Sequence, residues 1–277
     1  MQVVNSIPAM RAAVAASKRP LGLVPTMGFL HEGHLALVRQ ARADNAAVAV
    51  SIFVNPTQFG PAEDFAQYPR DVDRDLSLLR REGVDAVFVP AVEEMYPAGF
   101  GTSVLVEGIT ERLEGEFRPG HLRGVATIVA KLFNIVRPER AYFGQKDAQQ
   151  LRVIRKMVLD LNLPVEIRGA PTIREPDGLA LSSRNVMLSP VERAAATVLS
   201  RALGEARRRY EDGERSGDRL REVVRAVLAA EPLALADYVS VADADTLLEL
   251  AEMDQPALLS LAVRIGKVRL IDNVVLP

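Results

Sequence analysis

The chain has 277 residues, of which 48% are apolar and 25% are charged, so we expect a soluble globular protein with a sizeable core rather than a disordered chain. Its formal charge of −2 gives no electrostatic basis for binding nucleic acid or an anionic membrane. The absence of cysteine excludes disulfides, thiolate nucleophiles, iron–sulfur clusters and cysteine-based zinc sites.

No stretch of the sequence approaches the ~20 consecutive apolar residues of a membrane-spanning helix. Residues 1–18 lack the basic leader and apolar block of a secretory signal, so we expect a cytoplasmic protein. Three side chains titrate near neutral pH without help, namely His31, His34 and His121.

Short β-rich runs alternate with helical patterns in the first part of the chain. Strands are predicted at 21–25, 47–54, 84–90, 102–107, 141–143 and 164–170. Helices are predicted at about 33–45, 71–82, 125–136 and 147–161. Apolar strands separated by helices indicate a parallel sheet with helices on both faces. We therefore expect a doubly wound, Rossmann-like α/β domain over residues 1–172, with ligands beyond the carboxyl ends of its strands.

Residues 173–277 have a different pattern. Ser189-Pro190 predicts the start of a long helix that runs to about Asp212, because serine caps free amides and proline suits the first turn. A second helix is predicted at about 217–230, followed by three strands at 237–243, 257–266 and 268–276. We expect a smaller α+β domain. The arginines of 201–225 alternate with acidic residues, which favours a solvated helix face over a nucleic-acid patch.

The first candidate site is the predicted strand-to-helix junction in residues 25–41. Gly28 permits an unusual turn, and a helix N-terminus beyond it would present unpaired N–H groups to phosphate. His31 and His34 are three residues apart, so both could donate hydrogen bonds to phosphoryl oxygens. Alternatively, the histidines are structural, or form a zinc site with His121, although H-E-G-H lacks the H-E-x-x-H spacing.

Two further loops follow predicted strands. In residues 51–71, Asn55-Pro56 and Gly60-Pro61 predict a rigid loop that holds Gln58, whose amide both donates and accepts. In residues 141–157, Lys146 and Asp147 follow a glycine turn, where lysine could neutralise phosphate and aspartate could hold Mg²⁺. Lysine is rare in this chain, at five of 34 basic residues, which favours a functional role.

Two less specific segments complete the candidates. Residues 179–185 (LALSSRN) carry two hydroxyls and an arginine between the predicted domains, which fits a triphosphate clamp or a plain hinge. Residues 114–125 supply His121 and two arginines before a buried helix, and they have no unique interpretation by themselves.

Together these segments resemble a known family. HEGH at 31–34 is similar to the H-x-G-H signature of a nucleotidyltransferase superfamily. In chain order, PTMGFLHEGH, FVNPTQF, YPR, RPGH, FGQKDAQQL and LSSRN resemble the pantothenate synthetase (pantoate–β-alanine ligase) family. The departures are Leu122, Gln145 and Ala148, which affect fine packing rather than the phosphate-facing residues.

The resemblance implies an ATP-dependent condensation of pantoate with β-alanine. Pantoyl adenylate and pyrophosphate would form first, and β-alanine would then displace AMP to give pantothenate, a coenzyme A precursor. A homodimer, and a C-terminal domain that closes as a lid over ATP, are also implied.

The resemblance further assigns residues to roles. The implied ATP site comprises Met27, Gly28, Phe29, Leu30, His31, Glu32, Gly33, His34, Gly144, Gln145, Lys146, Asp147, Ile173, Leu181, Ser182, Ser183 and Arg184. The implied pantoate ligands are Gln58 and Gln150, and Gln58 also contacts β-alanine. The implied catalytic residues are His31, His34 (as proton donor), Lys146 and Arg184, and Asp147 would hold Mg²⁺ through the nucleotide phosphates.

Two other functions are consistent with parts of the pattern. The three histidines could support zinc-dependent hydrolysis, and the phosphate-binding segments could belong to a module that binds ATP without turning it over. The paired glutamines argue against such a module, because it needs no second substrate pocket.

Overall fold

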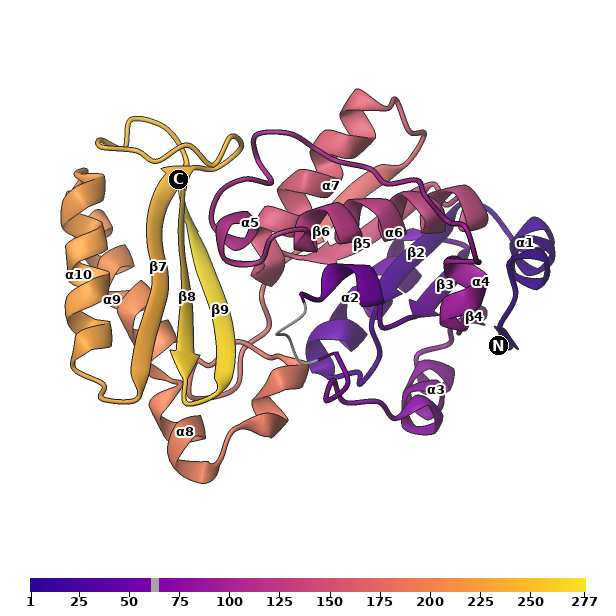
Figure 1. Cartoon of the computed structure of the whole chain (residues 1–277), viewed down its shortest axis with the longest axis horizontal. Helices are drawn as coiled ribbons and strands as arrows, with labels where there is room; N and C mark the ends of the chain where they lie inside the picture. Colours follow the sequence, from indigo (N-terminus) through magenta and orange to yellow (C-terminus); the bar gives the residue numbers. More distant parts are fainter. Residues whose placement is uncertain (61–64) are drawn as a thin grey trace. The chain divides into compact units, whose positions relative to one another are not determined.

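The computed structural model describes residues 1–60 and 65–277 (Figure 1). The chain divides into two compact units: a larger unit of residues 1–145 and 150–171, and a smaller unit of residues 146–149 and 172–277. Residues 146–149 group with the smaller unit although they precede the rest of it by more than twenty residues. One cause is a hydrogen bond of 2.8 Å from the Asn273 side chain to the Lys146 carbonyl oxygen.

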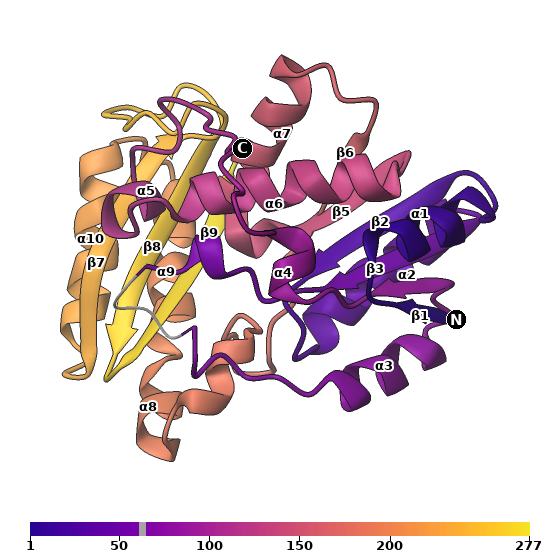
Figure 2. The ribbon, with the colours of Figure 1, turned by 45° about the vertical axis from the view of Figure 1, so that its right-hand side comes forward.

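A parallel sheet forms the centre of the larger unit. Its strands are β1 (Gln2–Val4), β2 (Leu21–Thr26), β3 (Ala47–Ile52), β4 (Ala86–Phe88), β5 (Arg140–Gly144) and β6 (Glu166–Ala170). They lie in the order β1-β4-β3-β2-β5-β6, and every neighbouring pair is parallel (Figure 2). The predicted doubly wound α/β fold is confirmed.

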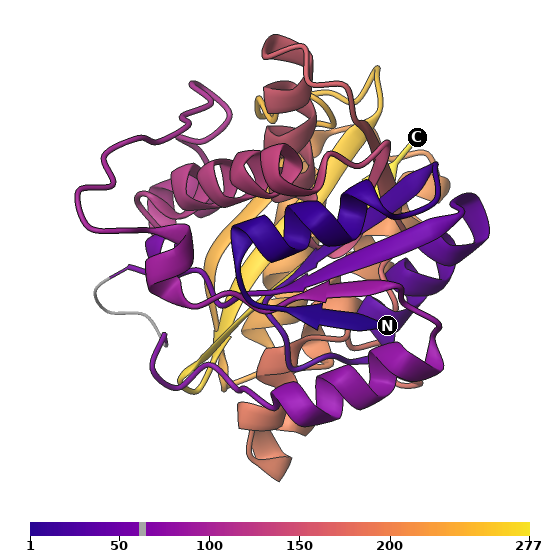
Figure 3. The ribbon, with the colours of Figure 1, turned by 90° about the vertical axis from the view of Figure 1, so that its right-hand side faces the viewer.

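Helices cover both faces of this sheet. The helices are α1 (Ile7–Ala15), α2 (Glu32–Asp44), α3 (Val72–Arg81), α4 (Val92–Met95), α5 (Glu114–Phe117), α6 (His121–Val136) and α7 (Ala148–Asp160). Val38 of α2 and Leu79 of α3 pack with Val48 and Val50 of β3 in one buried cluster. Helices α1 and α6 pack against each other on the opposite face (Figure 3). The carboxyl ends of the central strands therefore lead into helix N-termini, where the sequence predicts the site.

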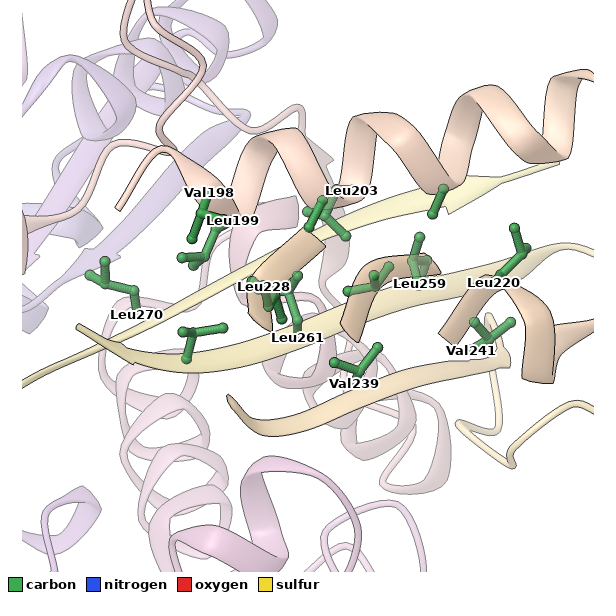
Figure 4. Close-up of a cluster of buried hydrophobic side chains, with 14 of the residues drawn as sticks. Val198, Leu199, Leu203, Leu220, Leu228, Val239, Val241, Leu259, Leu261 and Leu270 are labelled. Carbon is green, nitrogen blue, oxygen red and sulfur yellow. The ribbon is translucent and has the colours of Figure 1, made fainter. Parts of the chain in front are cut away.

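The smaller unit has a three-stranded antiparallel sheet in the order β7-β8-β9, formed by β7 (Ala234–Asp243), β8 (Ala257–Ile265) and β9 (Val268–Leu276). Its helices are α8 (Pro190–Ala195), α9 (Val198–Glu211) and α10 (Gly217–Ala229). Leu203 of α9 and Leu220 of α10 pack on Leu259 and Leu261 of the sheet, which gives this unit its own core (Figure 4). The predicted α+β character of this region is confirmed.

Several predicted elements are wrong or missing. Residues 1–18 contain β1 and α1, for which no prediction was made. Residues 102–107 form no strand, and Leu105 is 57% exposed: their β-branched residues have no neighbouring strand in the described sheet, and a strand needs one. Helix α6 begins at His121 rather than near 125, because Gly120 turns the chain with φ 85°.

The long predicted helix of residues 189–212 is two helices. Ala196 and Thr197 separate α8 from α9, and the Thr197 N–H bonds to the Ala194 carbonyl oxygen three residues back. Neither residue is glycine or proline, so the sequence carries no signal for this break. Among the helices that the structure describes, none is both long and apolar enough to span a membrane.

Candidate active site

The turn between β2 and α2 has an unusual backbone. Gly28 and Phe29 both have positive φ, at 81° and 49°, and His31 returns to an extended conformation as the N-cap of α2. The Thr26 hydroxyl accepts from the Gly28 N–H at 3.2 Å and donates to the Ser51 carbonyl oxygen at 2.7 Å. The turn is thus fastened to the carboxyl ends of β2 and β3.

His31 and His34 form one cluster at the start of α2. Their ring centroids lie 4.0 Å apart, and the His31 N–H donates to Nδ1 of His34 at 3.3 Å. Because Nδ1 of His34 accepts this bond, the neutral ring carries its proton on Nε2. His34 can therefore offer an Nε2–H donor next to the helix N-terminus, where negative charge is favoured.

A carboxylate from α3 lies under the same turn. Asp75 is 1% exposed, and its two oxygens accept from the N–H groups of Phe29 and Leu30, each at 2.7 Å. Burial raises the pKa of Asp75 above its usual value of 3.8, while the two backbone hydrogen bonds oppose that rise. The sequence predicts residues 71–82 only as a helix, and no pattern in it indicates this contact.

Gln58 is 7% exposed and lies at the end of the short 3₁₀ helix η1 (Pro56–Gln58), so it is not a solvated loop residue. The Asn55 side chain donates to Oε1 of Gln58 at 3.0 Å, and Nε2 of Gln58 lies 3.2 Å from the Met27 sulfur. The amide nitrogen of Gln58 is thereby directed toward the β2–α2 turn. Of the predicted Gly60-Pro61 turn, Pro61 lies outside the described residues.

Asn55 is held by a hydrogen-bond network. Its Oδ1 accepts from the Tyr96 hydroxyl at 2.7 Å and from the Thr57 hydroxyl at 3.0 Å, and its Nδ2 also donates to the Gly124 carbonyl oxygen. Burial raises the pKa of Tyr96, so the phenol keeps the proton that it donates. The network fixes which end of the Gln58 amide faces the turn.

His121, which had no unique interpretation in the sequence, lies against the same loop. Its Nδ1 is 2.8 Å from the Gln58 carbonyl oxygen and its Nε2 is 3.0 Å from a guanidinium nitrogen of Arg118. A carbonyl oxygen only accepts and a guanidinium only donates, so Nδ1 carries the proton and Nε2 accepts. His121 thus holds the backbone of Gln58 in place.

In the smaller unit, residues 173–181 form a short hairpin. The Leu181 N–H donates to the Ile173 carbonyl oxygen at 3.0 Å, so two segments of the predicted ATP site meet there. Ser182 caps the 3₁₀ helix η3 (Ser183–Met187), its hydroxyl accepting from the Arg184 N–H at 3.2 Å. The structure therefore brings residues 173 and 181–184 together within this unit.

Lys146 and Asp147 form the 3₁₀ helix η2 (Gln145–Asp147) directly after β5, and Gln150 lies in the first turn of α7. The Asn273 side chain holds the Lys146 carbonyl oxygen, and the neighbouring Asp272, 2% exposed, accepts two hydrogen bonds from Arg174 at 2.6 and 2.9 Å. One end of β9 thus fastens both Lys146 and the 173–181 hairpin. No sequence pattern indicated this role for Asp272 and Asn273.

A three-histidine zinc site is not formed by the residues that the structure describes. Within residues 1–60 and 65–277, no group of three or more His, Cys, Asp or Glu side chains could hold a metal ion. Asp147 offers one carboxylate beside a lysine. That donor set does not form a complete protein cage, but it fits Mg²⁺, which is usually bound by one or two carboxylates together with substrate phosphates.

Comparison with known proteins gives a consistent result. A family model described as pantoate-beta-alanine ligase matches residues 2–275. Pantothenate synthetase from Roseiflexus castenholzii is 64% identical over 276 residues, covering 100% of this chain and 99% of the relative. That from Chloroflexus aggregans is 65% identical over 274 residues, covering 99% of each.

Solved structures agree over the whole chain. The crystal structure of pantothenate synthetase from Thermus thermophilus has a TM-score of 0.95 and 51% sequence identity, covering 99% of both chains. The structure of pantoate-beta-alanine ligase from Francisella tularensis, complexed with beta-gamma ATP and beta-alanine, has a TM-score of 0.81 and 33% identity, covering 99% of this chain and 97% of that one.

Proposed function

The chain belongs to the pantoate–β-alanine ligase family, and from that premise we propose how its residues carry out the ligation. The enzyme joins pantoate to β-alanine with ATP and supplies a precursor of coenzyme A. We infer two steps. A pantoate carboxylate oxygen attacks the α-phosphorus of ATP, and pyrophosphate leaves as the C–O–P bond forms. The β-alanine amine then attacks the acyl carbon, the amide forms, AMP leaves, and the amine proton passes to solvent.

His34 acts in the first step. Its Nδ1 is occupied by the His31 N–H at 3.3 Å, so its Nε2–H is the group that donates to a phosphoryl oxygen. Charge on that oxygen increases as pyrophosphate leaves, and a preorganised donor stabilises the transition state more than the ground state. This hydrogen bond is the single observation on which the proposed role of His34 depends.

Gln58 binds pantoate and β-alanine, together with Gln150 for pantoate. Oε1 of Gln58 accepts from Asn55 at 3.0 Å, and one hydrogen of Nε2 is directed at the Met27 sulfur. We assign the second Nε2 hydrogen to substrate oxygens. A donor at this position suits a carboxylate or a hydroxyl oxygen. The bound carboxylate would lie near Met27 and the α2 N-terminus, because Nε2 is 3.2 Å from the Met27 sulfur.

The remaining ATP contacts come from Met27–His34, Gly144–Asp147, Ile173 and Leu181–Arg184. Lys146 and Arg184 would neutralise phosphate charge, and Ser182 and Ser183 would contribute hydroxyl hydrogen bonds. Asp147 would hold Mg²⁺ through the phosphates, and the ion supplies charge neutralisation at the phosphoryl oxygens when it is bound. Phosphoryl transfer needs such positioning and neutralisation rather than a covalent nucleophile, which fits a chain without cysteine.

Product analysis tests this mechanism. With Mg-ATP, pantoate and β-alanine, we expect AMP, pyrophosphate and pantothenate in equal amounts. Without pantoate, AMP formation should stop, because no acyl group is available to accept the adenylyl group. With pantoate but no β-alanine, a single turnover of pyrophosphate per active site should appear and pantoyl adenylate should remain bound.

Two outcomes contradict the proposal. Release of ADP in place of AMP would mean attack at the γ-phosphorus and would exclude the acyl adenylate. ATP binding with no pantothenate formed would support a nucleotide-sensing module instead. A homodimer, a cytoplasmic location and closure of residues 173–277 over ATP stay predictions from the sequence and the resemblance.

A further inference from the structure

Asp75 is the most deeply buried acidic side chain near the proposed ATP segment, and neither the family motifs nor the mechanism uses it. It lies in the first turn of α3, 46 residues after Phe29 and 45 after Leu30 in the chain. Each carboxylate oxygen accepts one N–H of these two consecutive residues at 2.7 Å. Both bonds are charge-assisted, and such bonds are about twice as strong as neutral ones.

The turn that Asp75 holds is unfavourable by itself. Phe29 has φ 49°, a left-handed conformation that is unfavourable for a residue with a Cβ. Gly28 precedes it with φ 81°, and a Cβ added there would lie 3.0 Å from Oδ2 of Asp75. The carboxylate therefore packs directly against the turn and offsets its strain.

Arg74 holds the other side of the same turn. Its guanidinium donates to the Leu30 carbonyl oxygen at 3.0 Å and lies 5.3 Å from the centre of the Phe29 ring. Two consecutive residues of α3 thus hold this turn. Asp75 binds the N–H groups of Phe29 and Leu30, and Arg74 binds the Leu30 carbonyl oxygen and contacts the Phe29 ring. His31 follows immediately, and its N–H sets the proton position on His34.

We infer that Asp75 is a positioning residue for the ligation: its carboxylate clamps the left-handed turn at Phe29 and Leu30 and thereby fixes His31 and His34 at the N-terminus of α2. The assignment rests on the proposed function for the identity of the reaction. Asp75 does not touch ATP in this scheme, because both of its oxygens are directed at backbone N–H groups.

The test is Asp75→Asn, which keeps the shape of the side chain. A carboxamide can accept one of the two N–H groups but presents its own N–H₂ to the other, so the clamp loses one bond. We expect faster amide hydrogen exchange in a peptide covering residues 27–35. We also expect kcat/KM for ATP to fall by ~10–100-fold, the scale for a displacement of about 1 Å at a reacting group, while KM for β-alanine changes less than about twofold.

Asp73→Asn is the matched control. It removes the same charge from the first turn of the same helix, but Asp73 is exposed, so both measurements should equal those of the unsubstituted chain. Arg74→Leu is a second variant, for the case in which Asp75→Asn does not fold. It removes the hydrogen bond to the Leu30 carbonyl oxygen at a partly exposed position. Amide exchange in residues 27–35 should become faster and kcat/KM for ATP should fall, each by less than in Asp75→Asn.

If Asp75→Asn left amide exchange in residues 27–35 unchanged, Asp75 would not hold the turn. If exchange became faster while kcat/KM for ATP stayed unchanged, Asp75 would hold the turn but would not be a positioning residue for the reaction. The exchange measurement needs no substrate. If the unsubstituted chain released no AMP, the proposed function would fail while the exchange data would still decide whether Asp75 holds the turn.

Discussion

Asp75 also gives the molecule an unusual dependence on pH. Burial raises its pKa above the usual 3.8, so between the unfolded and the folded pKa the folded state binds more protons than the unfolded state. The contribution of this group to stability therefore increases as pH falls through the folded pKa toward 3.8. Glu139 shows the opposite behaviour, since contacts with Leu21 and Arg19 lower its pKa despite its burial.

The pH dependence that Asp75 contributes to stability can be measured against Asp75→Asn, because the amide side chain of asparagine does not titrate. We expect the unsubstituted chain to gain stability relative to Asp75→Asn as pH is lowered from neutrality toward 3.8. The measurement is the difference between the opening free energies of the larger unit in the two proteins, obtained from amide hydrogen exchange of β2 and β3. Asp73→Asn is the matched control, because it removes the same charge from an exposed position in the same helical turn. A difference that stays constant or shrinks on acidification would mean that the pKa of Asp75 is not raised.

At the residue scale, local motifs predicted His31 and His34 at a strand-to-helix junction and Gln58 in the segment after the next strand. The structure has the histidines at the start of α2 and Gln58 in η1 after β3. The partners of these residues could not be predicted. Asp75 looks like an ordinary acid in a first helical turn, where it complements the helix dipole, and only the contact across 46 residues distinguishes it. The roles of His121 and Asn273 could not be predicted for the same reason, because their partners are distant backbone carbonyls.

At the element scale, the packing of α6 against η1 depends on one glycine. A Cβ added at Gly124 would lie 2.3 Å from the Thr57 carbonyl oxygen and 2.8 Å from Cα of Gln58. Backbone atoms cannot move aside as a flexible side chain can, so a larger residue must displace η1. The Gly124 carbonyl oxygen also accepts from Asn55, which orients Gln58.

Gly124→Ala should therefore weaken substrate binding. Alanine normally stabilises a helix interior by about 1 kcal/mol relative to glycine, but here we expect lower stability and a rise in KM for pantoate of ~10-fold, about 1.4 kcal/mol. Gly204→Ala in α9, where an added Cβ meets nothing within 4 Å, is the matched control and should raise the melting temperature. If the two variants had the same stability and the same KM for pantoate, the close approach of Gly124 would not hold η1 in place.

The strands β2, β3 and β4 were predictable because each is a largely buried, mainly apolar run. The predictions were wrong or incomplete where strand pairing or side-chain packing, and not the local sequence, determines the secondary structure. Residues 102–107 have strand-like residues but no strand in the described structure, and the three residues of β1 are too few to give a pattern yet pair with β4. The break between α8 and α9 has no glycine or proline to mark it.

At the scale of the whole molecule, each unit has its own buried core. Leu79, Val48 and Val50 belong to the core of the larger unit, and Leu199, Leu259 and Leu261 to that of the smaller unit. A unit with its own core unfolds as its own cooperative element. A single unfolding free energy is therefore not expected to describe this chain.

Cavity variants in the two cores test this separation. Leu261→Ala, at a fully buried position of β8, should destabilise the smaller unit by about 2–5 kcal/mol. Amide hydrogen exchange should then accelerate in α9, α10 and β7–β9 while the protection of β2, β3 and α2 stays unchanged. Leu79→Ala should give the reciprocal pattern, because Leu79 is equally buried in the larger unit. If either variant accelerated exchange in both units to the same extent, the chain would unfold as one cooperative structure, and the two cores would not be energetically separate.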